Sequence, residues 1–349
     1  MAILKVDTIS GIGTEGPVFE GDIEFTSQNF LTLPKGDTIQ RGRGRGFYML
    51  GYNGTPAAGP SARIDYINIQ SQGNSIRFGD LTTNRYTLGS GANSTRGLFC
   101  GGYQEGLSPD TDVNAIEFIT IATEGNAADF GDRTVVGRQP AAASNDTRCV
   151  MASGFTPAGY QNTIDKVEFA TTGNATDYGD LSSKRASMCM SCNSTTRGIF
   201  NGGYAPSPLT AFINTMEFIT FASTGDAVNF GDLTAAAGST PAGTAGNGTR
   251  GLIGLGYVAP ARTNSIDFCT IATTGDAADF GDLTAIGQNY GSCSNSTRGV
   301  FLGRNDPKTN IIDFVNIATT GNASDFGDVS VTESALGAAG SDSHGGLAE

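Results

Sequence analysis

A block of seventeen residues occurs six times in this chain of 349 residues, and its repetition limits the fold more than any other feature. Each copy starts with an apolar residue and an acid. A glycine follows nine residues after the apolar residue, and the copy ends with Phe-Gly-Asp or Tyr-Gly-Asp. The copies span residues 64–80, 116–132, 164–180, 216–232, 266–282 and 312–328. A constant spacing in six copies indicates one small supersecondary unit per copy.

The triplet Asp279-Phe280-Gly281 in one copy is identical to the metal-binding triplet of protein kinases. A kinase needs this triplet once, together with a glycine-rich phosphate loop and a catalytic His-Arg-Asp. Neither of these motifs occurs in the sequence, so the triplet indicates a recurring structural element.

Each repeat predicts four short antiparallel strands. A run such as residues 96–102 predicts the first strand, which begins with Arg-Gly and ends with glycine. The block then contains a second strand, a hairpin turn at its glycine and a third strand, and small residues lead on to the next arginine. Four strands per roughly 40–50 residues is the period of a β-propeller blade. We expect the Arg-Gly strand to lie innermost, because its glycines allow close packing near an axis.

The predicted fold is therefore all-β: a propeller of six four-stranded blades over residues 45–349, preceded by an extended N-terminal arm at residues 1–44. The Gly-Gly pair that ends several first strands resembles kelch repeats, which makes the expected propeller kelch-like. An alternative is a seventh, composite blade that pairs residues 345–349 with residues 14–22 and closes the ring.

Two positions of the block are expected to have structural roles in every blade. The aromatic residue of Phe-Gly-Asp should fill the core between neighbouring sheets. The aspartate should begin an Asx turn whose carboxylate caps backbone N–H groups. These residues are Phe78 and Asp80, Phe130 and Asp132, Tyr178 and Asp180, Phe230 and Asp232, Phe280 and Asp282, and Phe326 and Asp328.

Composition and charge exclude several classes of function. Thirty-four acids against 21 bases give a net charge of −13, which repels phosphate backbones and makes nucleic acid an unexpected partner. No run of eighteen apolar residues occurs, so we expect no membrane insertion. The N-terminus reaches Asp7 too early for a secretory signal.

Catalysis and metal binding are also unexpected. His344 is the single histidine, so neither a catalytic triad nor a histidine metal site is available. Paired carboxylates recur in every repeat, whereas a glycosidase needs one pair. The acidic turns would suit calcium, yet their spacing matches no calcium loop, and Asx capping is preferred. The six cysteines predict free thiols, with Cys192 and Cys293 in a small buried slot.

Six arginines open the first strands, and they face the acid that begins each second strand in the expected arrangement. One hypothesis is a ring of arginine–acid pairs that holds neighbouring blades together; the other is an exposed basic rim. These arginines are Arg45, Arg96, Arg148, Arg197, Arg250 and Arg298.

The connections after the first strand vary in length, while the seventeen-residue block does not. We expect these variable loops on one face, where binding residues concentrate. In five blades an aromatic residue follows the glycine of the first strand: Tyr52, Tyr103, Phe155, Tyr204 and Tyr257. These side chains could stack on a sugar or anchor a partner; alternatively, they close the top of the core.

Residues 1–25, MAILKVDTISGIGTEGPVFEGDIEF, resemble the start of structural proteins of marine tailed bacteriophages, especially those that infect cyanobacteria. Repeats such as residues 312–330 resemble the kelch-like repeats of the same phage proteins. In that group a common N-terminal segment precedes different bodies, which implies that residues 1–44 dock on the virion.

The expected function is that of a non-enzymatic virion structural protein, present as a homo-oligomer in the particle and assembled in the host cytoplasm. Residues 1–44 would contact other virion proteins, and the propeller would serve host adhesion, decoration or connection of the particle. Its partners would include a glycan or receptor of the host surface. An alternative is a free kelch-like lectin or protein-interaction propeller whose arm only closes the ring.

Overall fold

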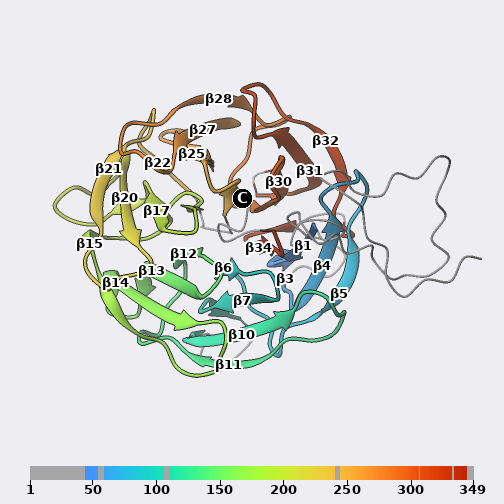
Figure 1. Ribbon diagram of the computed structural model, residues 1–349, viewed down its shortest axis with the longest axis horizontal. Helices are drawn as coiled ribbons and strands as arrows, with labels where there is room; N and C mark the ends of the chain where they lie inside the picture. Colours follow the sequence, from blue (N-terminus) through green and yellow to red (C-terminus); the bar gives the residue numbers. More distant parts are fainter. Residues whose placement is uncertain are drawn as a thin grey trace, which may run out of the picture. The chain divides into compact units, whose positions relative to one another are not determined.

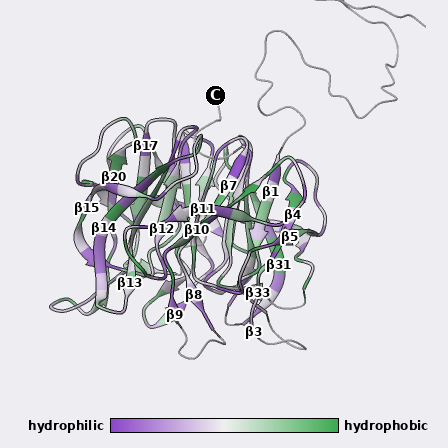
Figure 2. Ribbon diagram, turned by 90° about the horizontal axis from the view of Figure 1, so that it is seen from below, coloured by the Kyte–Doolittle hydropathy of each residue, from purple (hydrophilic) through white to green (hydrophobic). Residues whose placement is uncertain are grey.

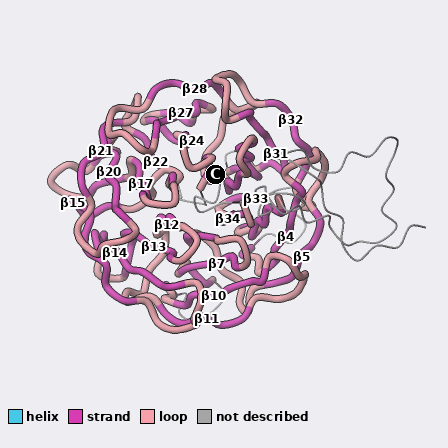
Figure 3. The backbone as a smooth tube through the Cα atoms, in the orientation of Figure 1, coloured by secondary structure: helices cyan, strands magenta, loops and turns pink. Residues whose placement is uncertain are grey.

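A computed structural model describes residues 44–53, 59–105, 111–239, 244–305, 307–331 and 334–343. Every regular element in these ranges is a β-strand (Figure 3). The described residues contain no helix that would be long and apolar enough to span a bilayer. The predicted all-β class is confirmed for this part of the chain. The predicted arm, except for Gly44, lies outside the described residues.

Six sheets repeat one antiparallel, four-stranded pattern, and Figure 1 shows them around a common centre. Ordered from the inner to the outer strand, sheet 1 contains β34 (Ala338–Ser341), β1 (Arg45–Met49), β4 (Arg63–Asn68) and β5 (Ile76–Asp80). Sheet 2 contains β6 (Gly89–Ala92), β7 (Arg96–Cys100), β10 (Ala115–Thr120) and β11 (Ala128–Asp132). Sheet 3 contains β12 (Ala141–Ser144), β13 (Arg148–Thr156), β14 (Gly159–Glu168) and β15 (Thr176–Arg185).

The remaining three sheets follow the same order. Sheet 4 contains β16 (Cys192–Asn193), β17 (Arg197–Asn201), β20 (Thr215–Thr220) and β21 (Val228–Asp232). Sheet 5 contains β23 (Ala245–Gly246), β24 (Arg250–Gly254), β27 (Ser265–Thr270) and β28 (Ala278–Asp282). Sheet 6 contains β29 (Gly291–Ser294), β30 (Arg298–Arg304), β31 (Thr309–Asn316) and β32 (Ser324–Asp328). The architecture is β-propeller-like.

Short strands in the connections define one face of this arrangement, which we call the loop face. They are β2 (Tyr52–Asn53), β3 (Gly59–Pro60), β8 (Tyr103–Gln104), β9 (Thr111–Asp112), β18 (Tyr204–Ala205), β19 (Ala211–Phe212), β22 (Ala237–Gly238), β25 (Tyr257–Val258), β26 (Ala261–Arg262) and β33 (Ser334–Ala335). In the side view of Figure 2, β3, β8, β9 and β33 lie together at the lower side. The opposite face carries the arginines that open β1, β7, β13, β17, β24 and β30, and we call it the arginine face.

The prediction that the Arg-Gly strand lies innermost is wrong. The strand of small residues that precedes each Arg-Gly strand takes the inner position and pairs with it, as β6 pairs with β7. Each inner strand also contacts the inner strands of both neighbouring sheets, including β34 with β6 and with β29. The smallest side chains therefore occupy the most crowded place, and each repeat contributes its last strand to the following sheet.

Near the centre, a glycine in one sheet lies against a larger side chain in the neighbouring sheet. A Cβ atom added to Gly46 would lie 2.7 Å from Sγ of Cys293, so the glycine makes room for the cysteine of the neighbouring sheet. Sheet 3 reverses the pair: Cys149 stands where other sheets have glycine, and a Cβ atom on Gly91 would lie 2.5 Å from its Sγ. All six cysteines are buried and free, as the sequence predicts.

The repeated block joins neighbouring sheets at their outer strands. Between sheets 1 and 2, the N–H of Gly125 donates to the carbonyl of Phe78 (3.1 Å), and Ala127 N–H donates to the carbonyl of Asp80 (2.8 Å). Asp80 N–H in turn donates to Oδ1 of Asn126 (3.1 Å). Equivalent bonds join every neighbouring pair of sheets, and Gly73 N–H donates to the carbonyl of Phe326 between sheets 6 and 1 (2.9 Å).

This close approach explains the glycine of Phe-Gly-Asp. A Cβ atom on Gly281 would lie 2.5 Å from the carbonyl oxygen of Gly321, nearer than any side chain allows. The aromatic residue beside the glycine is at most 4% exposed in all six copies. Phe130, for example, packs with Leu98, Ala142 and Phe169 between sheets 2 and 3.

The predicted Asx turn lies at a different residue. In none of the six described copies does the carboxylate of Phe-Gly-Asp cap backbone N–H groups. Asx turns occur instead just before the Arg-Gly strands, where Oδ1 of Asn295 accepts from the N–H of Thr297 (2.9 Å) and of Arg298 (2.7 Å). Asparagine suits this position because its short side chain can accept hydrogen bonds from backbone N–H groups two and three residues further along the chain.

The six arginines hold neighbouring sheets together, but not through acids. Nη1 of Arg298 donates to the carbonyls of Ile69 (3.1 Å) and Gln70 (2.8 Å) in sheet 1, and its guanidinium lies 5.1 Å from the ring centre of Phe314. Arg45, Arg96, Arg148, Arg197 and Arg250 donate in the same way to carbonyls of the following sheet. The predicted arginine–acid ring is therefore wrong in its partners, because the acids lie at the other end of the neighbouring strand.

Each of those acids is buried and binds the chain that arrives from the previous sheet. Glu117 accepts from the N–H (2.9 Å) and hydroxyl (2.7 Å) of Thr82 and pairs with Arg85 (2.9 Å). A serine or threonine of that arriving chain donates to the acid in all six sheets, through its hydroxyl in five of them and through the N–H of Ser182 in sheet 4. The paired arginine is not at one fixed repeat position. Arg85 and Arg185 stand five residues after the aspartate of Phe-Gly-Asp or Tyr-Gly-Asp, whereas Arg63, Arg133 and Arg304 each come from a different place. Among the described residues, Asp267 of sheet 5 has no cationic partner.

Candidate binding face

The five aromatic residues predicted for binding lie on the loop face. Each lies at or just beyond the end of the Arg-Gly strand of its sheet and is half-buried, and its backbone pairs with the chain that leads to an inner strand. The pairs are Tyr52 with Ala335, Tyr103 with Tyr86, Phe155 with Arg138, Tyr204 with Ala186 and Tyr257 with Gly238. Asn305 takes the equivalent place in sheet 6 and pairs with Gln288. The repeat thus brings one side chain per sheet to the same level of one face.

Additional aromatic side chains link these five into an aromatic arc. Its members are Tyr52, Tyr86, Tyr103, Phe155, Tyr160, Tyr204, Phe212 and Tyr257. Ring centres are 5.6 Å apart for Tyr52 and Tyr86, and 5.2 Å apart for Phe212 and Tyr257. The guanidinium of Arg138 bridges the one break, 4.5 Å from the ring centre of Tyr103 and 5.1 Å from that of Phe155. Distances of this size between ring centres are typical of favourable aromatic pairs.

Sequence reasoning missed three members of the arc. Tyr160 and Phe212 stand in loops whose length differs between repeats, so the repeat gives them no common position. Their only signal was an aromatic residue within a predicted variable loop. Tyr86 stands at a repeat position where other copies carry Arg138, Ala186, Gly238 or Gln288, so no residue type recurs there. Burial and a hydrogen bond to Glu105 raise the pKa of Tyr86, and burial raises the pKa of Tyr160. Both phenols therefore stay neutral near pH 7, and the arc presents uncharged rings.

A second group of residues surrounds the centre of the loop face. This axial ring consists of the residues that follow the pairs above: Thr87, Gln139, Ser187, Ser239, Asn289 and Leu336. Thr87 N–H donates to the carbonyl of Leu336 (3.1 Å), and Gln139 N–H donates to that of Thr87 (2.7 Å). Further bonds run from Ser239 N–H to the carbonyl of Ser187 and from Leu336 N–H to that of Asn289.

Five members of the axial ring have a left-handed backbone without being glycine, with φ between 51° and 60°. Such a conformation costs roughly 1–3 kcal/mol per residue and is kept where the surroundings fix it. For Thr87, whose side chain branches at Cβ, the conformation is exceptional. Strained residues of this kind cluster at binding and catalytic sites more than elsewhere.

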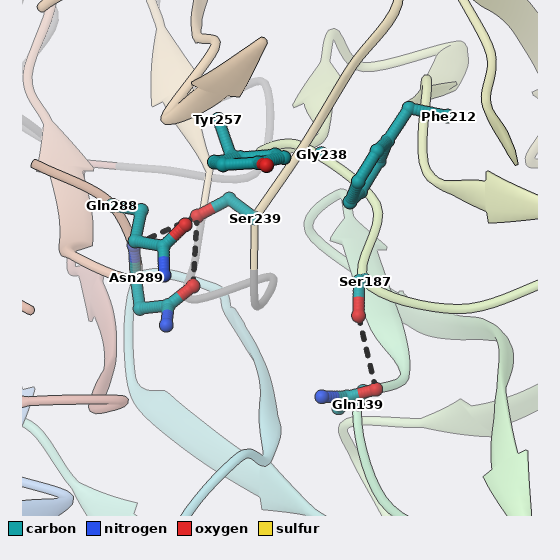
Figure 4. A pocket seen from close by; sticks show the side chains of 8 residues that line it. All are labelled: Gln139, Ser187, Phe212, Gly238, Ser239, Tyr257, Gln288 and Asn289. Atoms are coloured by element: carbon teal, nitrogen blue, oxygen red, sulfur yellow. Dashed lines mark hydrogen bonds between the residues drawn. The ribbon is translucent and has the colours of Figure 1, made fainter. Parts of the chain in front are cut away.

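A cavity of about 320 Å³ opens beside the axial ring (Figure 4). Three side-chain amides line it, from Gln139, Gln288 and Asn289, together with the hydroxyls of Ser187 and Ser239. The rings of Phe212 and Tyr257, at one end of the aromatic arc, complete the wall with Gly238. These residues come from sheets 3 to 6 and from the connections between them, so the cavity depends on the packing of several repeats.

The described residues contain no group of three or more His, Cys, Asp or Glu side chains that could hold a metal ion. His344 lies outside the described residues. The acidic turns that could suit calcium are spread over six sheets, with one block in each. The geometry therefore directs attention to the uncharged cavity and the aromatic arc.

Comparison with known proteins adds no relative: no family model matches the chain, and a search of curated proteins found no match.

Proposed function

We propose that this chain is a non-enzymatic structural protein of a tailed-phage virion. Residues 1–44 dock it on the particle, and residues 45–349 form a kelch-like propeller of six blades that contacts the host surface, or decorates or connects the particle. The resemblance of residues 1–25 and of the repeats to phage structural proteins supports the assignment. The partners proposed are other virion proteins for the arm and a host glycan or receptor for the propeller, with several copies in the particle.

One observation carries the proposal: the chain enters and leaves the described region on the arginine face. β1 runs from Arg45 towards β2, and β34 runs back beside it, with Gly46 paired to Ser341 and Met49 to Ala338. Gly44 N–H donates to Oδ1 of Asp342 (2.8 Å), so both ends of the region meet there. An anchor that precedes Gly44 therefore joins the described region on the face opposite the aromatic arc.

The alternative, an arm that only closes the ring of a free lectin, is less well supported. Sheet 1 already has four strands, and β34 occupies the inner position beside β1. Contacts of β34 with β6 and with β29 join the first and last sheets without residues 1–43. The composite seventh blade would use residues 14–22 and 345–349, which lie outside the described residues.

Deletion of residues 2–43 tests the proposal. We expect the shortened chain to keep the β-sheet circular dichroism spectrum and the cooperative unfolding of the full chain, and to be absent from purified particles. A matched variant, Tyr103→Ala with Phe155→Ala in the full chain, should join particles normally and reduce their adsorption to host cells. A shortened chain that still joins particles would contradict the docking role, and one that unfolds would favour the ring-closing arm.

A further inference from the structure

The cavity on the loop face has an uncharged but strongly polar lining. Among the described residues that line it, none is Asp, Glu, Lys or Arg. Carboxylate and phosphate groups are usually recognised by arginine or lysine, which supply charge-assisted hydrogen bonds. Amides and hydroxyls instead match neutral groups that both donate and accept, such as the hydroxyls of a sugar.

The polar groups and the aromatic rings occupy different sides of the cavity. Figure 4 shows the rings of Tyr257 and Phe212 on one side and the amides of Asn289 and Gln139 on the other. Ser187 Oγ donates to Oε1 of Gln139 (3.1 Å), which leaves the amide N–H groups of Gln139 as donors towards a ligand. A ligand with one apolar face and a polar rim satisfies both sides, and a pyranose ring has this form.

The cavity is small and its walls are held in place. About 320 Å³ lies at the lower end of the roughly 300–1,000 Å³ usual for small-molecule sites, which suits one or two sugar units. The backbone of Gln139, Ser187 and Asn289 is fixed in the left-handed region, with φ of 60°, 51° and 58°. Asn289 N–H also donates to Oγ of Ser239 (2.8 Å). A site that is already arranged loses less entropy when a ligand binds.

We propose that this cavity binds a terminal unit of an uncharged glycan, with the sugar hydroxyls on the amides of Gln139 and Gln288 and its apolar face on Tyr257. This inference rests on the proposed function, because it names the ligand class and the place for host-surface contact. The aromatic arc continues from Phe212 to Tyr204 (ring centres 5.3 Å apart) and offers further rings to the following sugar units.

Titration of the full chain with monosaccharides tests the inference. The probes are glucose, galactose, mannose and N-acetylglucosamine, with glucuronate as a charged comparison, followed by saturation-transfer NMR and calorimetry. We expect at least one neutral sugar to bind, and Tyr257→Ala and Gln139→Ala to weaken that binding at least tenfold. Val228→Ala alters an exposed residue of β21 away from the cavity and should bind like the unmodified chain.

Gly238→Ala provides a variant that removes no side chain. Its Cβ atom would lie 2.5 Å from Cδ1 of Phe212 and 2.7 Å from the carbonyl oxygen of Ser187, so this part of the cavity wall must shift. We expect weaker sugar binding with an unchanged circular dichroism spectrum. Binding of glucuronate alone, or equal binding by all cavity variants and the unmodified chain, would overturn the inference.

The two proposals fail in different ways. If particles that carry the chain adsorb to cells but the chain binds none of the neutral sugars, the glycan site is wrong and the virion role stands. If the chain binds a neutral sugar through Tyr257 and Gln139 but joins particles without residues 2–43, the site stands and the docking role is wrong.

Discussion

The two faces of the molecule follow the repeat to different degrees. On the arginine face, every sheet donates an arginine to carbonyls of the next sheet, and Asn or Ser side chains cap the turn before it. On the loop face, the bond from a serine or threonine to the acid recurs, while the arginine partner changes place and the loops differ in length. The contacts that hold sheets together on the arginine face are repeated, whereas the arginine partners and the loops vary on the face where the cavity lies. The comparison separates scaffold from candidate site without any functional assay.

Removal of β34 should have the largest effect, because it breaks the repeated arrangement at one place. A chain that ends at Gly337 loses the partner of β1 and the bonds from Gly44 and Arg45 to Asp342. The total stability of a domain is only about 5–15 kcal/mol, so we expect no cooperative unfolding transition in urea. As a control, Arg77→Ala removes an exposed pair with Asp80 and should leave the transition unchanged. A normal transition in the truncated chain would show that β34 is dispensable.

The contribution of the arginine partner to stability can be measured by removing one acid that has such a partner and one that has none. Glu117→Ala leaves the fully buried Arg85 without its counter-charge and should lower the free energy of unfolding by about 3–5 kcal/mol. Asp267→Ala leaves only the N–H and hydroxyl of Thr234 unbonded, which costs about 1–3 kcal/mol. Urea denaturation of both variants measures the difference. Equal losses would mean that the arginine adds nothing beyond the repeated hydroxyl bond.

A substitution at the contact between Gly91 and Cys149, near the centre, should lower the free energy of unfolding by a smaller amount. Gly91→Ala places a methyl group against Cys149 and should cost about 1–3 kcal/mol from overpacking. In a Cys149→Gly background the same substitution should cost much less, because the sulfur is gone. A double-mutant cycle by thermal or urea unfolding measures this coupling. Additive losses would contradict a direct size match between the two positions.

The smallest expected effect is a pH dependence in sheet 5. Burial raises the pKa of Asp267, although hydrogen bonds from Thr234 partly oppose the rise. An acid with a raised pKa in the folded state contributes stability below its unfolded pKa of about 3.9, and this contribution is lost as pH rises through the folded pKa. In Asp267→Asn we expect this decline to disappear from urea midpoints measured between pH 4 and 7. A variant with the same pH profile as the unmodified chain would contradict a raised pKa.

Most of the strand pattern was predictable, because a repeat multiplies each weak signal six times. The repeated block identified Phe280 as a core aromatic before any geometry was known, whereas the close backbone approach at Gly281 is visible only in the folded chain. Register between sheets was less accessible: nothing in Arg298 itself shows that its partners are the carbonyls of Ile69 and Gln70, more than two hundred residues earlier. The predicted innermost strand was wrong for the same reason, because the inner strand of each sheet comes from the preceding repeat and the sequence of one repeat does not show this pairing.

The candidate site was predictable only where it follows the repeat. Tyr257 and its four equivalents share a position after glycine, so the sequence identified them. Gln139, Ser187 and Asn289 share a left-handed backbone conformation but not a residue type. A positive φ can be predicted from sequence where glycine occupies the position, and none of these three residues is glycine. The cavity depends on neighbours from four sheets, which come together only in the folded chain.

The seam between β1 and β34 also determines how this molecule would respond to mechanical load. A pull on Gly44 runs along β1, which lies between two antiparallel partners, β34 and β4. The ladder bonds on both sides are perpendicular to that pull. Tension therefore acts on them in shear and is shared by both ladders, whereas a pull across the strand would open the bonds one after another. The strand that begins at Arg45 is therefore held so that it resists tension along its own axis.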